Sequence, residues 1–150
     1  MRHIEGGLYQ GNVRDRTNLE ALEEAGITAV VNVASADMAR FGLDTIDEKA
    51  DGIAYYDYGL MDYDLTMVGK ETLDEWKAAV GKVTELLSSG ERVLVHCISG
   101  SNRSSLVCAC ALHLWRGIPF DEAVEMLTDK IPESRYMCEK SLEVLRRLIG

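Results

Sequence analysis

The sequence predicts an α/β domain with a central, mostly parallel sheet flanked by helices. Short apolar runs rich in β-branched residues alternate with longer segments whose apolar residues recur at helical spacing. The sequence HCISGSN, residues 96–102, lies between the apolar run Val93–Val95 and the apolar segment Leu106–Trp115. We therefore expect a loop between a central strand and a buried helix, at the strand's carboxyl end, where such sheets bind ligands.

The predicted strands are short and apolar. The β-branched run Ile27–Val33 is fit for a buried strand. In chain order the predicted strands are a strand pair within Ile4–Gln10, then Ile27–Val33, Gly52–Tyr58 and Arg92–His96.

The predicted helices follow from capping signals and apolar stripes. Thr17 opens a capping box, and Gly26 ends the helix that follows it. A long helix is predicted for about Gly69–Ser88, and Leu106–Trp115 is apolar on nearly every side, which predicts burial at the centre of the domain. Pro119 begins the next helix, and Ser134 is the expected cap of the last one.

Length and composition limit the classes of protein to which this chain can belong. With 150 residues, we expect residues 1–150 to form a single domain. No apolar run approaches the ~18 residues of a membrane span, and the first residues, MRHIEGGLYQG, hold no signal-peptide core. We therefore expect a cytoplasmic protein whose four cysteines are reduced thiols.

The charge balance is acidic, with 16 basic and 25 acidic residues and a formal net charge of −9. The longest basic cluster is Arg146–Arg147. This argues against nucleic acid or an anionic membrane surface as the main partner. It does not exclude a small anionic substrate, because an anion site is local.

The predicted loop suits both an anion and a nucleophile. Cys97 lies where a strand ends and a helix begins, beside backbone N–H groups that have no partner within the helix. Such donors, with the positive end of the helix dipole, bind phosphate and stabilise a thiolate. Arg103 at the same helix start is unfavourable against the dipole, so its position also indicates an anion.

The loop resembles the signature loop of the cysteine-dependent protein tyrosine phosphatases. That signature is His-Cys, five residues, then Arg and Ser or Thr, and His96, Cys97, Gly100, Arg103 and Ser104 match it. The short chain resembles the dual-specificity branch. The resemblance implies hydrolysis of phosphotyrosine and phosphoserine or phosphothreonine through a phosphocysteine, without metal or other cofactor. Its implied partners are phosphorylated proteins or peptides, and we expect a monomer.

The resemblance also implies roles for individual residues. Cys97 would be the nucleophile, Arg103 would bind two phosphoryl oxygens, and Ser104 would stabilise the leaving thiolate. His96 would have a supporting role, orienting the loop and helping to keep the thiol ionised. The residues implied in phosphate binding are Ile98, Ser99, Gly100, Ser101, Asn102 and Arg103.

A general acid must protonate the leaving oxygen. The family places an aspartate after the strand upstream of the signature, and the candidates are Asp57, Asp62 and Asp64. Asp57 lies inside the predicted strand. The spacing of GIAYYDYGLMD, residues 52–62, is similar to that segment of dual-specificity phosphatases and puts the acid at Asp62, with Asp64 as the alternative.

Two positions depart from the dual-specificity pattern. Many such enzymes carry Ala-Gly and a Ser before the arginine, where this chain has Ser99-Gly100 and Asn102. An Asn there is also similar to the RNA 5′-triphosphatase branch, although that branch tends to carry a histidine at the position of Ser99. Phosphoinositide or inositol-phosphate hydrolysis is a further alternative, although no loop lysine supports it. A phosphate-binding pseudophosphatase would have lost the nucleophile, the arginine or the acid, and all three are present.

Overall fold

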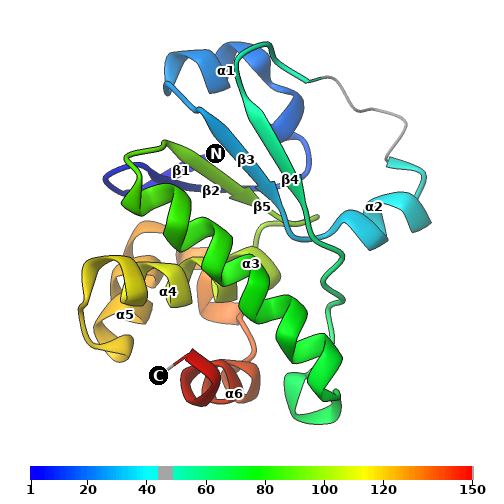
Figure 1. The fold of residues 1–150 in the computed structure, drawn as a ribbon, viewed down its shortest axis with the longest axis vertical. Coiled ribbons are helices and arrows are strands. Elements are labelled where there is room, and N and C mark those ends of the chain that lie inside the picture. The colour runs from blue at the N-terminus through cyan, green and yellow to red at the C-terminus, as the bar shows by residue number, and fades with distance from the viewer. Residues whose placement is uncertain (44–48, 150) are drawn as a thin grey trace.

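A computed structural model describes residues 1–43 and 49–149, and it contains a five-stranded sheet that is mostly parallel (Figure 1). The spatial order of the strands is β1-β2-β5-β3-β4. Only the β1–β2 pair is antiparallel among these strands. The strands are β1 Arg2–Glu5, β2 Leu8–Gly11, β3 Ala29–Asn32, β4 Ala54–Asp57 and β5 Val93–His96. The predicted α/β class is therefore confirmed.

The register of the sheet brings four strand ends to one edge. His96, the last residue of β5, pairs with Gly11 at the end of β2 and with Asn32 at the end of β3. Asn32 in turn pairs with Asp57 at the end of β4. Because parallel strands end together, everything that follows these four residues gathers along the carboxyl edge.

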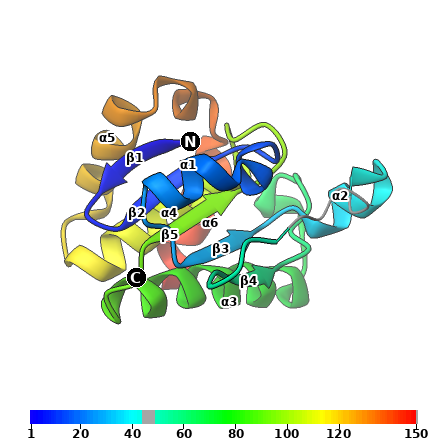
Figure 2. The ribbon, with the colours of Figure 1, turned by 90° about the horizontal axis from the view of Figure 1, so that it is seen from above.

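Helices cover both faces of the sheet. Helices α3, α4 and α5 pack on one face, with α6 outside them against α3 and α4. Helix α1 packs on the other face, where its Leu22 joins a small core with strand residues Val30 and Leu94 (Figures 1 and 2). The short helix α2 projects from the end of the sheet in both views. The α-helices are α1 Leu19–Glu24, α2 Ser35–Arg40, α3 Lys70–Ser88, α4 Arg103–Arg116, α5 Phe120–Lys130 and α6 Glu139–Ile149, and short 3₁₀ turns are η1 Asp15–Thr17, η3 Leu65–Met67 and η4 Pro132–Tyr136.

Some helix boundaries differ from the prediction because the side chains expected to cap them bond elsewhere. Asn18, not Thr17, caps α1 by accepting the N–H of Ala21. Ser134 lies inside η4, where its hydroxyl donates to the carbonyl of Ile131, so α6 begins later than expected. Helix α2 was not predicted, since its six residues carry no apolar stripe.

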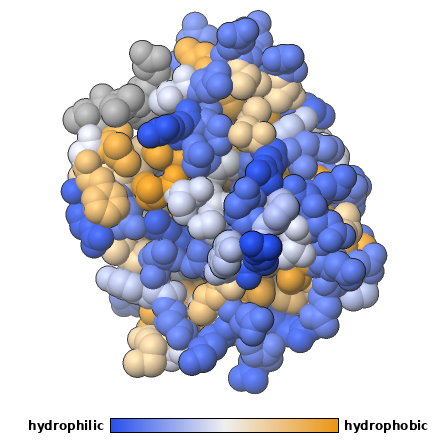
Figure 3. Space-filling model, turned by 180° about the vertical axis from the view of Figure 1, so that it is seen from behind, coloured by the Kyte–Doolittle hydropathy of each residue, from blue (hydrophilic) through white to orange (hydrophobic). Residues whose placement is uncertain are grey.

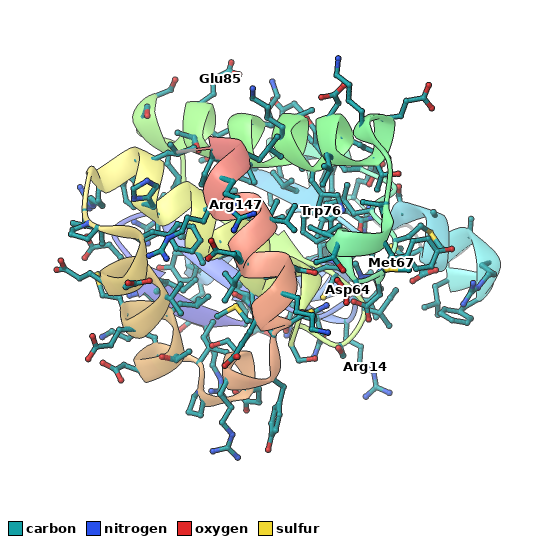
Figure 4. The ribbon with its side chains drawn as sticks, turned by 90° about the horizontal axis from the view of Figure 1, so that it is seen from below. Arg14, Asp64, Met67, Trp76, Glu85 and Arg147 are labelled. Carbon is teal, nitrogen blue, oxygen red and sulfur yellow. The ribbon has the colours of Figure 1, made fainter. Side chains whose placement is uncertain are left out.

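Helix α4 forms the centre of the core, as its apolar sequence predicted. Residues 103–112 of this helix are all buried. Against it packs α3, which contributes the buried Trp76 (Figure 4). Seen from behind, the surface is mostly hydrophilic, with hydrophobic side chains gathered near α2 (Figure 3). Among the described residues, no helix combines the length and the apolar character needed to cross a membrane.

Candidate active site

Residues 97–102, here called the cysteine loop, join β5 to α4 at the carboxyl edge of the sheet. Cys97 is only 2% exposed, and two polar groups contact its sulfur. The N–H of Gly100 donates to Sγ at 3.2 Å, and the hydroxyl of Ser104 lies 3.3 Å from it. A sulfur that receives hydrogen bonds is stabilised as an anion.

Glycine is required at position 100. Gly100 has φ +77°, and a Cβ there would lie 2.8 Å from the carbonyl oxygen of Gly11. The turn is further tied to β2 because Gln10 Nε2 donates to the carbonyl of Gly100 at 2.8 Å. The N–H of Val13 also donates to the carbonyl of Ile98 at 3.1 Å. These contacts fix the shape of the cysteine loop from the neighbouring strand.

His96 supports the loop as a neutral ring. Its Nε2 lies 3.2 Å from Arg16 Nη1, and its Nδ1 lies 3.0 Å from the carbonyl of Cys97. Because arginine can only donate and a carbonyl can only accept, Nε2 accepts and Nδ1 carries the proton. Burial, with the positive charge of Arg16, lowers the pKa of His96 to about 4, against the opposing effects of the Cys97 carbonyl and of Asp57 and Asp15. His96 therefore orients the carbonyl of Cys97, but the neutral ring has no charge with which to keep the thiol ionised.

Arg103 is held by groups that the sequence did not indicate. Its Nη1 donates to Asp37 Oδ2 at 2.8 Å and to the carbonyl of Leu60 at 2.8 Å. Both members of the Arg103–Asp37 pair are almost fully buried. Since both hydrogen bonds use Nη1, the Nε–Nη2 edge of the guanidinium is left for a bidentate ligand such as phosphate.

Of the three aspartates considered as acids, Asp62 is the one bonded to the cysteine loop. Its Oδ1 accepts a hydrogen bond from Asn102 Nδ2 at 2.5 Å. Asp57 instead faces Asn32 at 3.1 Å and Arg16 at 3.6 Å.

Asp64 is engaged elsewhere. Its side chain caps η3, beside α6 (Figure 4), by accepting hydrogen bonds from the N–H and the hydroxyl of Thr66. These bonds lower the pKa of Asp64, which favours the ionised form rather than a proton donor.

The structure thus brings five of the predicted site residues together: His96, Cys97, Arg103, Ser104 and Asp62. Two of the residues predicted to bind phosphate, Ser99 and Ser101, have hydroxyls that bond to each other at 2.9 Å. Sequence reasoning missed three residues that hold this site together. They are Gln10, Arg16 and Asp37. Gln10 and Asp37 lie near the carboxyl ends of predicted strands, which is the one signal that could have marked them.

The family model for the dual specificity phosphatase catalytic domain matches residues 8–148. A strand, the cysteine loop and a buried helix follow one another along the chain, with Arg103 at the helix start and Asp62 bonded to the loop through Asn102. The chain belongs to the dual specificity phosphatase catalytic domain family.

Individual relatives agree with this family. The chain is 30% identical over 127 residues to human dual specificity protein phosphatase 2, an alignment that covers 82% of this chain and 35% of that protein. It is 27% identical over 135 residues to human dual specificity protein phosphatase 12, covering 90% of this chain and 37% of that protein. The chain therefore spans about a third of the length of these curated relatives.

Solved structures share the fold. A mouse putative dual specificity phosphatase complexed with zinc tungstate superposes with a TM-score of 0.79 at 23% identity, covering 99% of this chain and 85% of that chain. Human DUSP28 superposes with a TM-score of 0.77 at 20% identity, covering 98% and 94% of the two chains.

Proposed function

We propose that residues 1–150 form one catalytic domain that hydrolyses phosphotyrosine and phosphoserine or phosphothreonine in proteins through a phosphocysteine. The observation that carries this proposal is the surroundings of Cys97 Sγ. The sulfur lies on the N–H-rich cysteine loop, and the Ser104 hydroxyl lies 3.3 Å from it. The Arg103 guanidinium at the same helix start is held through Nη1 alone.

In the first step, the thiolate of Cys97 attacks phosphorus, so an S–P bond forms as the P–O bond to the substrate breaks. The N–H groups of residues 98–102 and the Nε–Nη2 edge of Arg103 bind the equatorial oxygens, whose charge grows in the transition state. Asp62 gives its proton to the leaving oxygen.

In the second step, water attacks phosphorus and the S–P bond breaks. Asp62, now ionised, takes a proton from that water. The Ser104 hydroxyl stabilises the departing thiolate because it already lies at hydrogen-bond distance from Sγ. Inorganic phosphate leaves, and the enzyme returns to its starting protonation state. No step requires a metal or other cofactor.

The RNA 5′-phosphatase alternative rested on Asn102. That side chain bonds to Asp62 and to the N–H of Cys138, so its presence no longer favours an RNA substrate. Phosphoinositide hydrolysis has no residue in the described site to support it. We therefore propose phosphorylated proteins or peptides as the partners, and neither nucleic acid nor membrane.

The test is a panel of phosphotyrosine, phosphoserine and phosphothreonine peptides, inositol phospholipids and triphosphate-ended RNA, assayed in EDTA. We expect turnover of the phosphopeptides, and none by Cys97→Ser although this variant still binds vanadate. Asp62→Asn should lower kcat by about 10²–10⁴-fold on phenyl phosphate, and Asp64→Asn should change it little. Turnover by Cys97→Ser, or turnover of the lipids or RNA alone, would contradict the proposal.

We also propose a cytoplasmic monomer. The four cysteines are thiols in the structure, as suits a reducing compartment. Fractionation of cells and light scattering of the purified protein test the two statements separately.

A further inference from the structure

Residues 58–64, here called the Asp62 loop, leave the sheet with Tyr58 bonded to Asn32 and Ser35 and Gly59 bonded to Glu75, and three further contacts bear on the position of Asp62. The carbonyl of Leu60 accepts from Arg103 at 2.8 Å. Just beyond the loop, the N–H of Leu65 donates to the buried Ser141 hydroxyl on α6 at 3.0 Å. These two contacts hold backbone. The third, from Asn102, is made to the Asp62 carboxylate itself.

The orientation of the Asn102 amide is determined by its second partner. The N–H of Cys138, one residue before α6, points to Asn102 Oδ1 at 2.9 Å. Cys138 also begins the helical hydrogen-bond pattern, because its carbonyl accepts from Leu142. Its N–H is therefore one of the donors that a helix start leaves unpaired. Since an N–H needs an acceptor, the oxygen of the amide must face Cys138 and the NH₂ must face Asp62.

This orientation determines where the proton of Asp62 can reside. The NH₂ of Asn102 is a donor, so the oxygen that it contacts, Oδ1, must accept in both protonation states of Asp62. Because the carbonyl oxygen of a protonated carboxyl group accepts more strongly than its hydroxyl oxygen, this contact favours the proton on Oδ2. Asp62 and its neighbour Tyr63 are both exposed, so little packing would otherwise restrict this side chain.

We propose that Asn102 is a positioning residue for the general acid: it fixes the Asp62 side chain and leaves Oδ2 as the oxygen that donates the proton. The inference rests on the proposed phosphatase function. It also assigns a purpose to a residue that departs from the usual pattern of the signature loop. A serine at this position has a shorter side chain, which would not span the distance to Asp62 while also reaching Cys138.

The experiment compares Asn102→Ala and Asn102→Ser with the wild type on two substrates. Phenyl phosphate has a leaving group that needs a proton, and p-nitrophenyl phosphate has a more acidic one that needs it far less. Misplacing a catalytic group by about 1 Å can cost about 10²-fold. We therefore expect both variants to lose about 10- to 100-fold in kcat on phenyl phosphate, with a much smaller loss on p-nitrophenyl phosphate and an unchanged KM.

A double-mutant cycle separates positioning from a general structural role. If Asn102 acts through Asp62, adding Asn102→Ala to Asp62→Asn should cause no further loss. The matched control is Asn18→Ala, which removes the capping asparagine of α1 without touching Asp62 or Cys138 and should cost stability, not kcat. Circular dichroism melting confirms that each variant is folded at the assay temperature.

Three results would overturn the inference but not the proposed function. The first is a wild-type kcat on phenyl phosphate in both Asn102 variants, and the second is an equal loss of kcat on the two substrates. The third is a loss of kcat in the double variant equal to the sum, in free energy, of the losses of Asn102→Ala and Asp62→Asn. A different result would overturn the proposed function and the inference with it. That result is absence of turnover by the wild type, or turnover by Cys97→Ser.

Discussion

The neutral, buried ring of His96 should make the stability of this protein depend on pH. Burial lowers the pKa of His96 to about 4 in the folded state, whereas the ordinary value is 6.5. Between these two values the unfolded chain binds a proton at this residue and the folded chain does not. Stability must therefore rise with pH in this range, and it is lost as the pH falls from 6.5 toward about 4.

The size of the effect follows from the difference between the two values. Each pH unit between them is worth about 1.4 kcal/mol, so His96 contributes about 3 kcal/mol at neutral pH that is absent below pH ~4. Between pH 7.5 and 4.5 the expected loss is about 2.5 kcal/mol. With a urea m-value of about 1–3 kcal/mol/M, this lowers the unfolding midpoint by about 0.8–2.5 M.

The assay is urea unfolding followed by circular dichroism at half-unit steps from pH 7.5 to 4.5. Because carboxylates titrate over the lower part of this range, the informative quantity is the difference between the wild type and His96→Asn. Asn keeps a donor near the carbonyl of Cys97 but removes the titrating ring. The variant should be less stable at pH 7.5 and should have a flatter curve. His3→Asn, the same change at an exposed position, should leave the curve in place. A His96→Asn curve parallel to the wild type would refute the argument.

Three further outcomes are expected. Asp37→Ala should raise KM and lower kcat on every phosphate ester, because Arg103 loses its buried partner. Asp37→Asn keeps a hydrogen-bond acceptor for Arg103 and should lose less activity, and steady-state kinetics checks both variants. Gly100→Ala should nearly abolish turnover in a chain that still folds, since the added Cβ strikes backbone; kinetics and melting test this together. Burial raises the pKa of Cys110 to about 12 and that of Cys108 above its usual range, so mass spectrometry after brief peroxide treatment should find neither oxidised.

The fold was predictable because local patterns and long-range packing agree along most of the chain. The β-branched runs that became β3 and β5 are buried on both faces, and the uniformly apolar segment that became α4 lies at the centre. The helix boundaries that were predicted wrongly lie where short polar side chains compete for the same backbone hydrogen-bonding groups. Thr17 and Ser134 have the chemistry of caps, but neighbouring turns use their hydrogen bonds, and no sequence pattern shows which of two adjacent candidates will cap.

The candidate site was predictable only where one short segment carries the chemistry. Cys97, Arg103 and Ser104 lie within eight consecutive residues, so strand, loop and helix geometry alone bring them together. Asp37 and Asn102 depend on chain crossings that no local pattern encodes. Asp37 reaches Arg103 across 66 residues, from a helix too short to predict.

From the sequence, Asn102 was predicted to contribute to phosphate binding, and as a departure from the family pattern it also suggested a different substrate. Its contacts connect the Asp62 loop, 40 residues earlier, with the start of α6, 36 residues later. A departure from a family pattern is thus ambiguous until its partners are known: the same side chain can change what the site binds or can position a group that the site already has. In this chain both of its polar atoms have protein partners, which favours the second explanation.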